Sequence, residues 1–127
     1  MNSTSQLYSD IELTTEVMTA SNHRLIQMLF DKCLQHIYLS RNHILAQDYQ
    51  SKRYNISKAA DIVNYLRTCL NFEDKQAADL VTLLDSLYVF LEKSLLQATL
   101  KNETQYLDQA EKVLSIVKSG WDGIASK

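Results

Sequence analysis

The chain has 127 residues, a formal net charge of −2 and a pI near 5.9. This length is enough for one hydrophobic core, and the lysines and arginines are scattered along the sequence, which excludes the basic stripe of a nucleic-acid-binding protein. Two glycines and no proline are too few turn residues for sandwiches, barrels or Rossmann turns, so the composition predicts an all-α fold.

The first 20 residues predict an arm rather than a regular element. They are rich in serine and threonine, and their apolar residues, which include Tyr8 and Ile11, follow no sustained helical or strand period. The arm lacks the cationic and apolar regions of a signal peptide, and no segment resembles a transmembrane helix, so we expect a cytoplasmic protein without membrane insertion. Its apolar residues indicate either simple docking on the body of the protein or a displaceable cover over a groove.

Two long amphipathic helices are expected next, over residues 22–46 and 49–70. Ser21 and Asp48 stand before them as N-caps, because their side chains can accept hydrogen bonds from the first free backbone amides. In the second helix, Ile62 and Cys69 are seven residues apart and lie beside the regular apolar seam. The predicted inner lines are Ile26, Phe30, Cys33, Ile37 and Ile44 in the first helix and Ile56, Ala59, Val63, Leu66 and Leu70 in the second.

Two further helices follow over residues 76–101 and 103–119, with a polar turn at 71–75 before them and Asn102 as a terminator between them. The last helix has a narrow apolar stripe, which favours packing on one side only, and Trp121 is expected to anchor its C-terminal end. Short connections between helices of similar length predict an antiparallel up-down four-helix bundle over residues 21–121, followed by a tail at 122–127. The stripe of the last helix is Leu107, Ala110, Leu114, Val117 and Trp121.

The third helix carries more apolar residues than its own packing requires. In residues 80–100, 13 of 21 positions are apolar, whereas a helix packed on one side needs about three in seven. Leu83 and Phe90 lie on one flank of the inner arc, and Val89 and Leu96 lie on the other. This surplus predicts a groove for an amphipathic polypeptide; the alternative is that the chain's own helices cover the third helix on several sides. The inner arc is Leu80, Val81, Leu84, Leu87, Tyr88, Leu91, Leu95 and Ala98.

The sequence contains no pattern typical of catalysis or metal binding. His36 and His43 are seven residues apart, but there is no Glu-x-x-His pair, and Cys33 and Cys69 stand at apolar positions that favour packing in or near the core. No glycine precedes Gly120, so the sequence lacks nucleophile elbows and phosphate-binding loops. We therefore expect no enzyme activity, no cofactor and no metal. Four arginines that could surround an anionic substrate are spread over two helices: Arg24, Arg41, Arg53 and Arg67.

Several short motifs, taken in order, point to a known family. The N-terminal set is Tyr8, Thr19-Ala20-Ser21, Leu25-Ile26 and Met28-Leu29-Phe30-Asp31. The remaining set is Lys58-Ala59, Ile62, Leu66, Leu83, Leu87-Tyr88, Leu91, Leu95, Ala98, Lys101-Asn102 and Trp121. Together they resemble the flagellar secretion chaperone FliS family over about residues 8–121. The chain departs from the family pattern at Asn22, where a proline is usual, and at Asn71, Val89-Phe90 and Thr99.

The resemblance implies a non-enzymatic export chaperone that holds the disordered C-terminal region of flagellin, blocks premature polymerisation and helps to deliver flagellin to the flagellar type III export gate. We expect the client to fold into amphipathic helices in apolar grooves, with the arm moving aside, and the chaperone to be a monomer or weak homodimer. A self-associating helical bundle, an adaptor with another helical client and a small helical enzyme are the alternatives. The expected partner-binding residues are Tyr8, Ile11, Ile62, Leu66, Cys69, Leu83, Leu87, Phe90 and Leu96.

Overall fold

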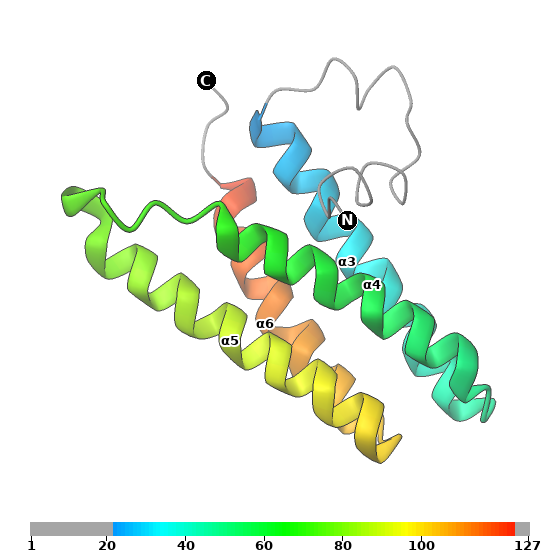
Figure 1. Ribbon diagram of the computed structural model, residues 1–127. Helices are drawn as coiled ribbons and strands as arrows, with labels where there is room; N and C mark the ends of the chain where they lie inside the picture. The colour runs from blue at the N-terminus through cyan, green and yellow to red at the C-terminus, as the bar shows by residue number, and fades with distance from the viewer. Residues whose placement is uncertain (1–21, 124–127) are drawn as a thin grey trace.

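The computed structural model describes residues 22–123, which form four long α-helices and one short 3₁₀ helix (Figure 1). The helices are α3 (Asn22–Leu45), α4 (Tyr49–Thr68), α5 (Ala78–Lys101) and α6 (Gln105–Asp122), with η1 (Lys75–Ala77) before α5. Helices α3 and α5 each pack on both α4 and α6. The all-α antiparallel bundle is thus confirmed. The expected N-terminal arm, with Tyr8 and Ile11, and the Ser21 N-cap lie outside the described residues.

The helix ends coincide with local capping signals. Asp48 caps α4, because its carboxylate accepts a hydrogen bond from the Ser51 amide at 3.2 Å. Asn102 ends α5 in a left-handed conformation with φ at 53°, which asparagine tolerates better than most residues. After this turn, α6 begins at Gln105, slightly later than the expected residue 103, and continues to Asp122.

One hydrophobic core runs along the bundle and contains residues from all four long helices. The predicted inner lines of α3, α4 and α6 are buried over most of their length, as expected from their periodicity. Cys33 packs within this core, and burial raises the pKa of its thiol to about 12. Large apolar side chains that are almost fully buried are Phe30, Ile37, Ile62, Val63, Leu91, Leu95, Leu107 and Leu114.

Charged side chains join neighbouring helices at the bundle surface. Between α3 and α6, the Arg41 guanidinium lies 2.9 Å from an Asp108 carboxylate oxygen and 2.8 Å from a Glu111 carboxylate oxygen. Between α4 and α5, Arg67 Nε donates a hydrogen bond to Asp85 Oδ1 at 2.6 Å. These two arginines stabilise different seams of the bundle, so they do not gather around one anion.

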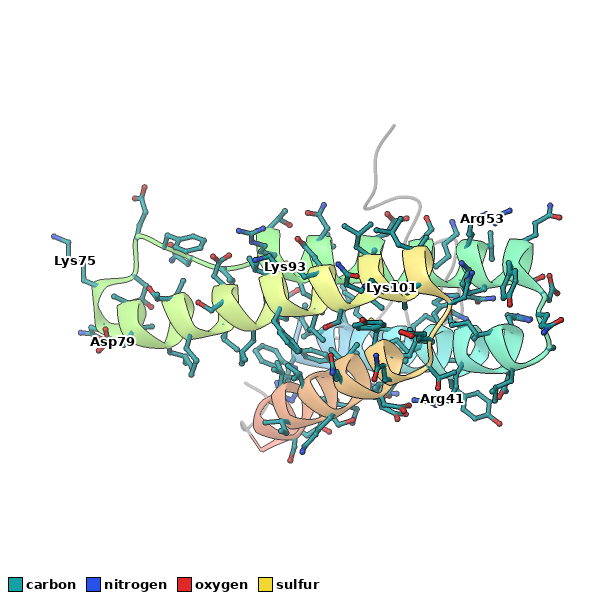
Figure 2. All side chains as sticks on the ribbon, turned by 90° about the horizontal axis from the view of Figure 1, so that it is seen from below. Arg41, Arg53, Lys75, Asp79, Lys93 and Lys101 are labelled. Carbon is teal, nitrogen blue, oxygen red and sulfur yellow. The ribbon has the colours of Figure 1, made fainter. Side chains whose placement is uncertain are left out.

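The first turns of α5 project beyond the ends of α3 and α6 (Figures 1 and 2). Figure 2 shows Lys75 and Asp79 at this projecting end, whereas Arg41 lies toward the other end of the bundle. Leu80 lies in these first turns and is 54% exposed. The expectation that Leu80 belongs to the buried inner face is therefore wrong, because the described part of the chain provides no helix to cover it.

Ile62 is wholly buried, contrary to the expectation that it contacts a partner. Its side chain is 0% exposed and belongs to the core. Helix α4 packs on α3 as well as on α5, so a position beside the α4 seam is covered by a second helix. An apolar residue that lies off the main line of a bundle helix is thus not necessarily free for binding.

Candidate functional site

An apolar cavity of about 460 Å³ lies at the end of the bundle where α3 and α5 begin and where α4 and α6 end. All four long helices contribute to its wall. A volume of this size is typical of ligand-binding pockets and is large enough for more than one side chain. The lining residues are Ile26, Phe30, Leu66, Cys69, Leu70, Leu80, Leu84, Leu87, Tyr88, Ile116, Val117, Gly120 and Trp121.

The cavity exists because α5 continues past the helices on which it packs. Leu84, Leu91 and Leu95 lie on one face of α5, and farther along the helix this face is buried in the core. In the N-terminal half of α5, Leu80, Leu84 and Leu87 continue this apolar face and line the cavity. There the surface meets no covering helix among residues 22–123 and remains open beside α6.

Trp121 forms a fixed part of the cavity wall. Its indole Nε1 donates a hydrogen bond to the backbone carbonyl oxygen of His23 at 3.0 Å. The His23 ring also stacks on the indole, with 4.9 Å between ring centroids and 16° between the ring planes. These contacts join the end of α6 to the start of α3, and they confirm the prediction that Trp121 anchors the C-terminal end of the last helix.

Among residues 22–123, the side chains that line the cavity are all uncharged. Burial, with smaller contributions from the Cys69 and Cys33 side chains, raises the pKa of Tyr88 to about 12, so its phenol is neutral at physiological pH. The described lining residues therefore offer no ionised side chain to a ligand in the cavity. Its chemistry suits an apolar ligand.

The structure brings together three of the sequence-predicted binding residues and leaves three others on the surface. Leu66, Cys69 and Leu87 line the cavity. Leu66 is only 3% exposed, so a ligand could reach it only through the cavity. The surface residues are Leu83, Phe90 and Leu96, which are 54%, 40% and 56% exposed.

The surface residues lie on two different flanks of α5. At about 100° per residue, Leu83 and Phe90 fall on the flank nearer to α6, next to the cavity-lining Leu87. Leu96 falls on the opposite flank, toward α4. Their exposure agrees with the predicted surplus of apolar side chains on this helix, while their role in binding a partner stays a prediction.

Cys69 is exposed, contrary to the expectation that both cysteines pack in or near the core. It stands at the C-cap of α4, where its amide bonds to the carbonyl oxygens of the last helical turn. The seam periodicity does not reveal that the helix ends one residue before it. Its position on the cavity wall, rather than burial, explains why an apolar residue type is compatible with this site.

The α3 and α6 residues of the cavity wall were not predicted as site residues. Phe30 and Val117 lie on the predicted inner lines and look like ordinary core residues in the sequence. Ile116, however, lies off the narrow stripe of α6 and is 63% exposed. In the sequence, the position of Ile116 outside the inner stripe of the last helix is the feature that indicates an additional apolar contact surface on this helix.

The two histidines that lie seven residues apart, His36 and His43, both have side-chain neighbours within the fold. The ring of His36 is buried, with Nδ1 2.8 Å from Asn55 Oδ1, and His43 Nδ1 lies 3.8 Å from an Asp48 carboxylate oxygen. Within residues 22–123, no group of three or more potential ligand side chains could hold a metal ion. None of the helices described is long and apolar enough to cross a lipid bilayer.

The chain is similar to flagellar secretion chaperones over nearly its whole length. It is 34% identical over 118 residues to FliSB of Pseudomonas aeruginosa, covering 93% of this chain and 92% of that protein. It is 31% identical over 124 residues to FliS of Vibrio cholerae, covering 98% and 90%. It is 33% identical over 121 residues to FliS of Salmonella typhimurium, covering 94% and 88%.

A solved structure supports the fold. The crystal structure of a bacterial flagellar chaperone superposes with a TM-score of 0.72 at 18% sequence identity and covers 94% of this chain and 93% of that one. The family model for the flagellar protein FliS matches residues 4–127. The chain therefore belongs to the FliS family of flagellar secretion chaperones and is not an enzyme.

Proposed function

We propose that this protein is a cytoplasmic export chaperone that binds the disordered C-terminal region of flagellin. By holding this region it would prevent premature polymerisation and assist delivery of flagellin to the flagellar type III export apparatus. Membership of the FliS family supports the chaperone role and implies a client protein. The observation that supports an apolar client segment is the open cavity, whose described lining residues are uncharged and mostly apolar.

The cavity is one part of the proposed contact surface. A disordered segment that folds on binding loses conformational entropy, and such complexes bury about 1,000–3,000 Å² to compensate. A cavity of about 460 Å³ does not provide that area alone. We therefore propose that the client continues from the cavity over Leu83 and Phe90, with Leu96 providing a further contact on the α4 side.

The proposal includes the N-terminal arm, whose residues Tyr8 and Ile11 lie outside the described part of the chain. In the free protein the arm would cover apolar surface of the site, and it would move aside when the client binds. Deletion of residues 1–12 should then raise the association rate of the client. An equal or lower rate would mean that the arm has only a structural role.

A pair of substitutions on one helix tests the proposed site. Leu80 lines the cavity, and Leu100 lies at the other end of α5; the two side chains are 54% and 66% exposed. Both can accept an aspartate without loss of core packing. Binding of a flagellin C-terminal peptide, measured by isothermal titration calorimetry, should weaken at least about tenfold in Leu80→Asp and stay within about twofold in Leu100→Asp.

The same samples distinguish the proposal from self-association. If the apolar surface of α5 binds a second copy of the chain, sedimentation velocity should show a dimer. The Leu80→Asp substitution should disrupt this dimer, whereas the peptide should not dissociate it. If the surface binds flagellin, the peptide should form a complex of defined stoichiometry with the chaperone. Equal peptide affinity of the wild-type and Leu80→Asp proteins would reject the cavity as the client site.

A further inference from the structure

Gly120 is the lining residue that brings no side chain to the cavity wall. It lies inside α6, one turn after Ile116 and directly before Trp121. Glycine is the poorest helix former after proline, because it loses the most backbone freedom when a helix forms. A glycine at this position therefore weakens α6, and the fold must either require it or tolerate it.

The fold of the described residues does not require a glycine here. Neither glycine in the described range has a positive φ, so the backbone conformation at Gly120 suits any L-residue. A Cβ atom built at Gly120 meets no heavy atom within 4 Å. Neither backbone strain nor crowding thus explains the missing side chain, and an alanine would fit without movement of any neighbour.

The missing side chain instead leaves the α6 backbone open to the cavity. A helical side chain leans toward the N-terminus of its own helix, so a residue larger than glycine at position 120 would cover the wall toward Ile116. On the other side the wall is the Trp121 indole, which the hydrogen bond to His23 holds in place. The open strip between these two side chains is accessible, because Gly120 is exposed and Ile116 is 63% exposed.

We propose that Gly120 is a specificity-determining residue of the client site. Its missing side chain lets a large aliphatic or aromatic side chain of an amphipathic client helix pack directly on the α6 backbone, between Ile116 and Trp121. The uncharged wall and the width of the cavity fit such a side chain, and a branched residue at position 120 would exclude it. This inference rests on the proposed function, because it takes the flagellin segment as the client.

Trp121 is the only tryptophan of the chain, so its fluorescence reports directly on this wall. The experiment titrates a tryptophan-free flagellin C-terminal peptide into the full-length chain and follows the emission of Trp121. The variants are Gly120→Leu, which fills the strip, and Gly120→Ala, which adds one methyl group. Gly123→Leu is the matched control, because Gly123 ends the same helix but does not line the cavity.

The proposal predicts a graded loss of affinity. Gly120→Leu should bind the peptide at least about tenfold more weakly, Gly120→Ala about two- to threefold more weakly, and Gly123→Leu should stay within about twofold of the wild type. Far-UV circular dichroism should show native helix content in all variants. Since alanine favours helix, Gly120→Ala keeps the test valid even if Gly120→Leu does not fold.

The other outcomes separate this inference from the proposed function. If the wild type binds the peptide and both Gly120 variants bind equally well, the client does not pack on α6 at this position and the inference is wrong, while the proposed function stands. Binding without any change in Trp121 emission would overturn the inference in the same way. If the wild-type chain does not bind the peptide, the proposed function and the inference both fail.

Discussion

The ammonium group of Lys52 donates a hydrogen bond to Asn102 Oδ1 at 2.6 Å, which joins the first turn of α4 to the residue that ends α5. A second hydrogen bond runs from Lys52 Nζ to the Thr99 carbonyl oxygen at 2.9 Å. The side chain is 1% exposed. A positive charge therefore sits at the C-terminal end of α5, where free carbonyl groups and the helix dipole favour a cation.

Replacing Lys52 by methionine should lower the free energy of unfolding by about 2–3 kcal/mol, because two charge-assisted hydrogen bonds are lost while the apolar stem is retained. Urea denaturation followed by circular dichroism measures this change. Lys101→Met is the matched control, since Lys101 lies in the same region but is exposed. Equal stability of the Lys52→Met and Lys101→Met variants would show that the buried contacts of Lys52 do not hold α4 and α5 together.

The N-cap of α4 should contribute to the acid sensitivity of the bundle. Hydrogen bonds from Ser51 hold the pKa of Asp48 below its usual value of 3.8 in the folded state. A carboxyl group with a depressed folded-state pKa stabilises the fold above its unfolded pKa, and this contribution is lost as the pH falls through the folded-state pKa. Asp48 thus stabilises the protein at neutral pH and ceases to do so in acid.

Asp48→Asn separates the charge from the cap, because asparagine also caps helices but does not titrate in this range. The difference in thermal midpoint between wild type and variant should be largest near neutral pH and should shrink as the pH falls below about 4. Thermal unfolding at a series of pH values measures it. A difference that is constant over the acid range would mean that the Asp48 carboxylate does not contribute through its ionisation.

Features that depend on local sequence could be predicted, whereas those that depend on neighbouring helices could not. The Asp48 cap and the Asn102 terminator each act within one turn of the chain, so residue type and position suffice to recognise them. Periodicity gives the side of a helix that is buried but not how far around the helix the neighbours extend. For that reason periodicity places Ile62 among the partner-binding residues, although it is buried in the core and lies on a helix that packs on both α3 and α5.

The cavity could not be predicted because it results from the relative lengths of the helices. Leu80 continues the inner arc of α5 in sequence, yet α3 and α6 do not extend to cover it. Ile116 and Gly120 belong to α6, whose narrow apolar stripe predicts only that the helix packs on the bundle with one side. The surplus of apolar residues on α5 predicts a groove along the flanks of that helix, whereas the cavity lies among the ends of all four long helices.

The two cysteines should differ sharply in their reaction with a thiol reagent. Cys33 is buried with its pKa raised to about 12, so it should react only when the protein unfolds. Cys69 is exposed on the cavity wall and should react in the native state. A bound flagellin peptide should slow the labelling of Cys69, as measured by mass spectrometry over time. Labelling of Cys69 at the same rate with and without saturating peptide would place the client away from this wall.

Phe90 tests whether the client continues outside the cavity. Phe90→Asp should weaken binding of the flagellin peptide at least about tenfold and leave the helical circular dichroism unchanged, because the side chain is already 40% exposed. Leu45→Asp is the control, since Leu45 is 70% exposed and ends α3 at the other end of the bundle. Unchanged affinity of the Phe90→Asp variant would limit the contact surface to the cavity itself.

Methyl NMR of the full-length chain with a flagellin C-terminal peptide tests the central claim most directly, because it reports every leucine and isoleucine in one titration. We predict that the methyl resonances of Leu80, Leu84, Leu87 and Ile116, which line the cavity, shift or broaden in proportion to the bound fraction. Those of Leu45 and Leu100 should stay unchanged. Shifts confined to Leu45 and Leu100, with the cavity resonances unaffected at saturation, would contradict the account.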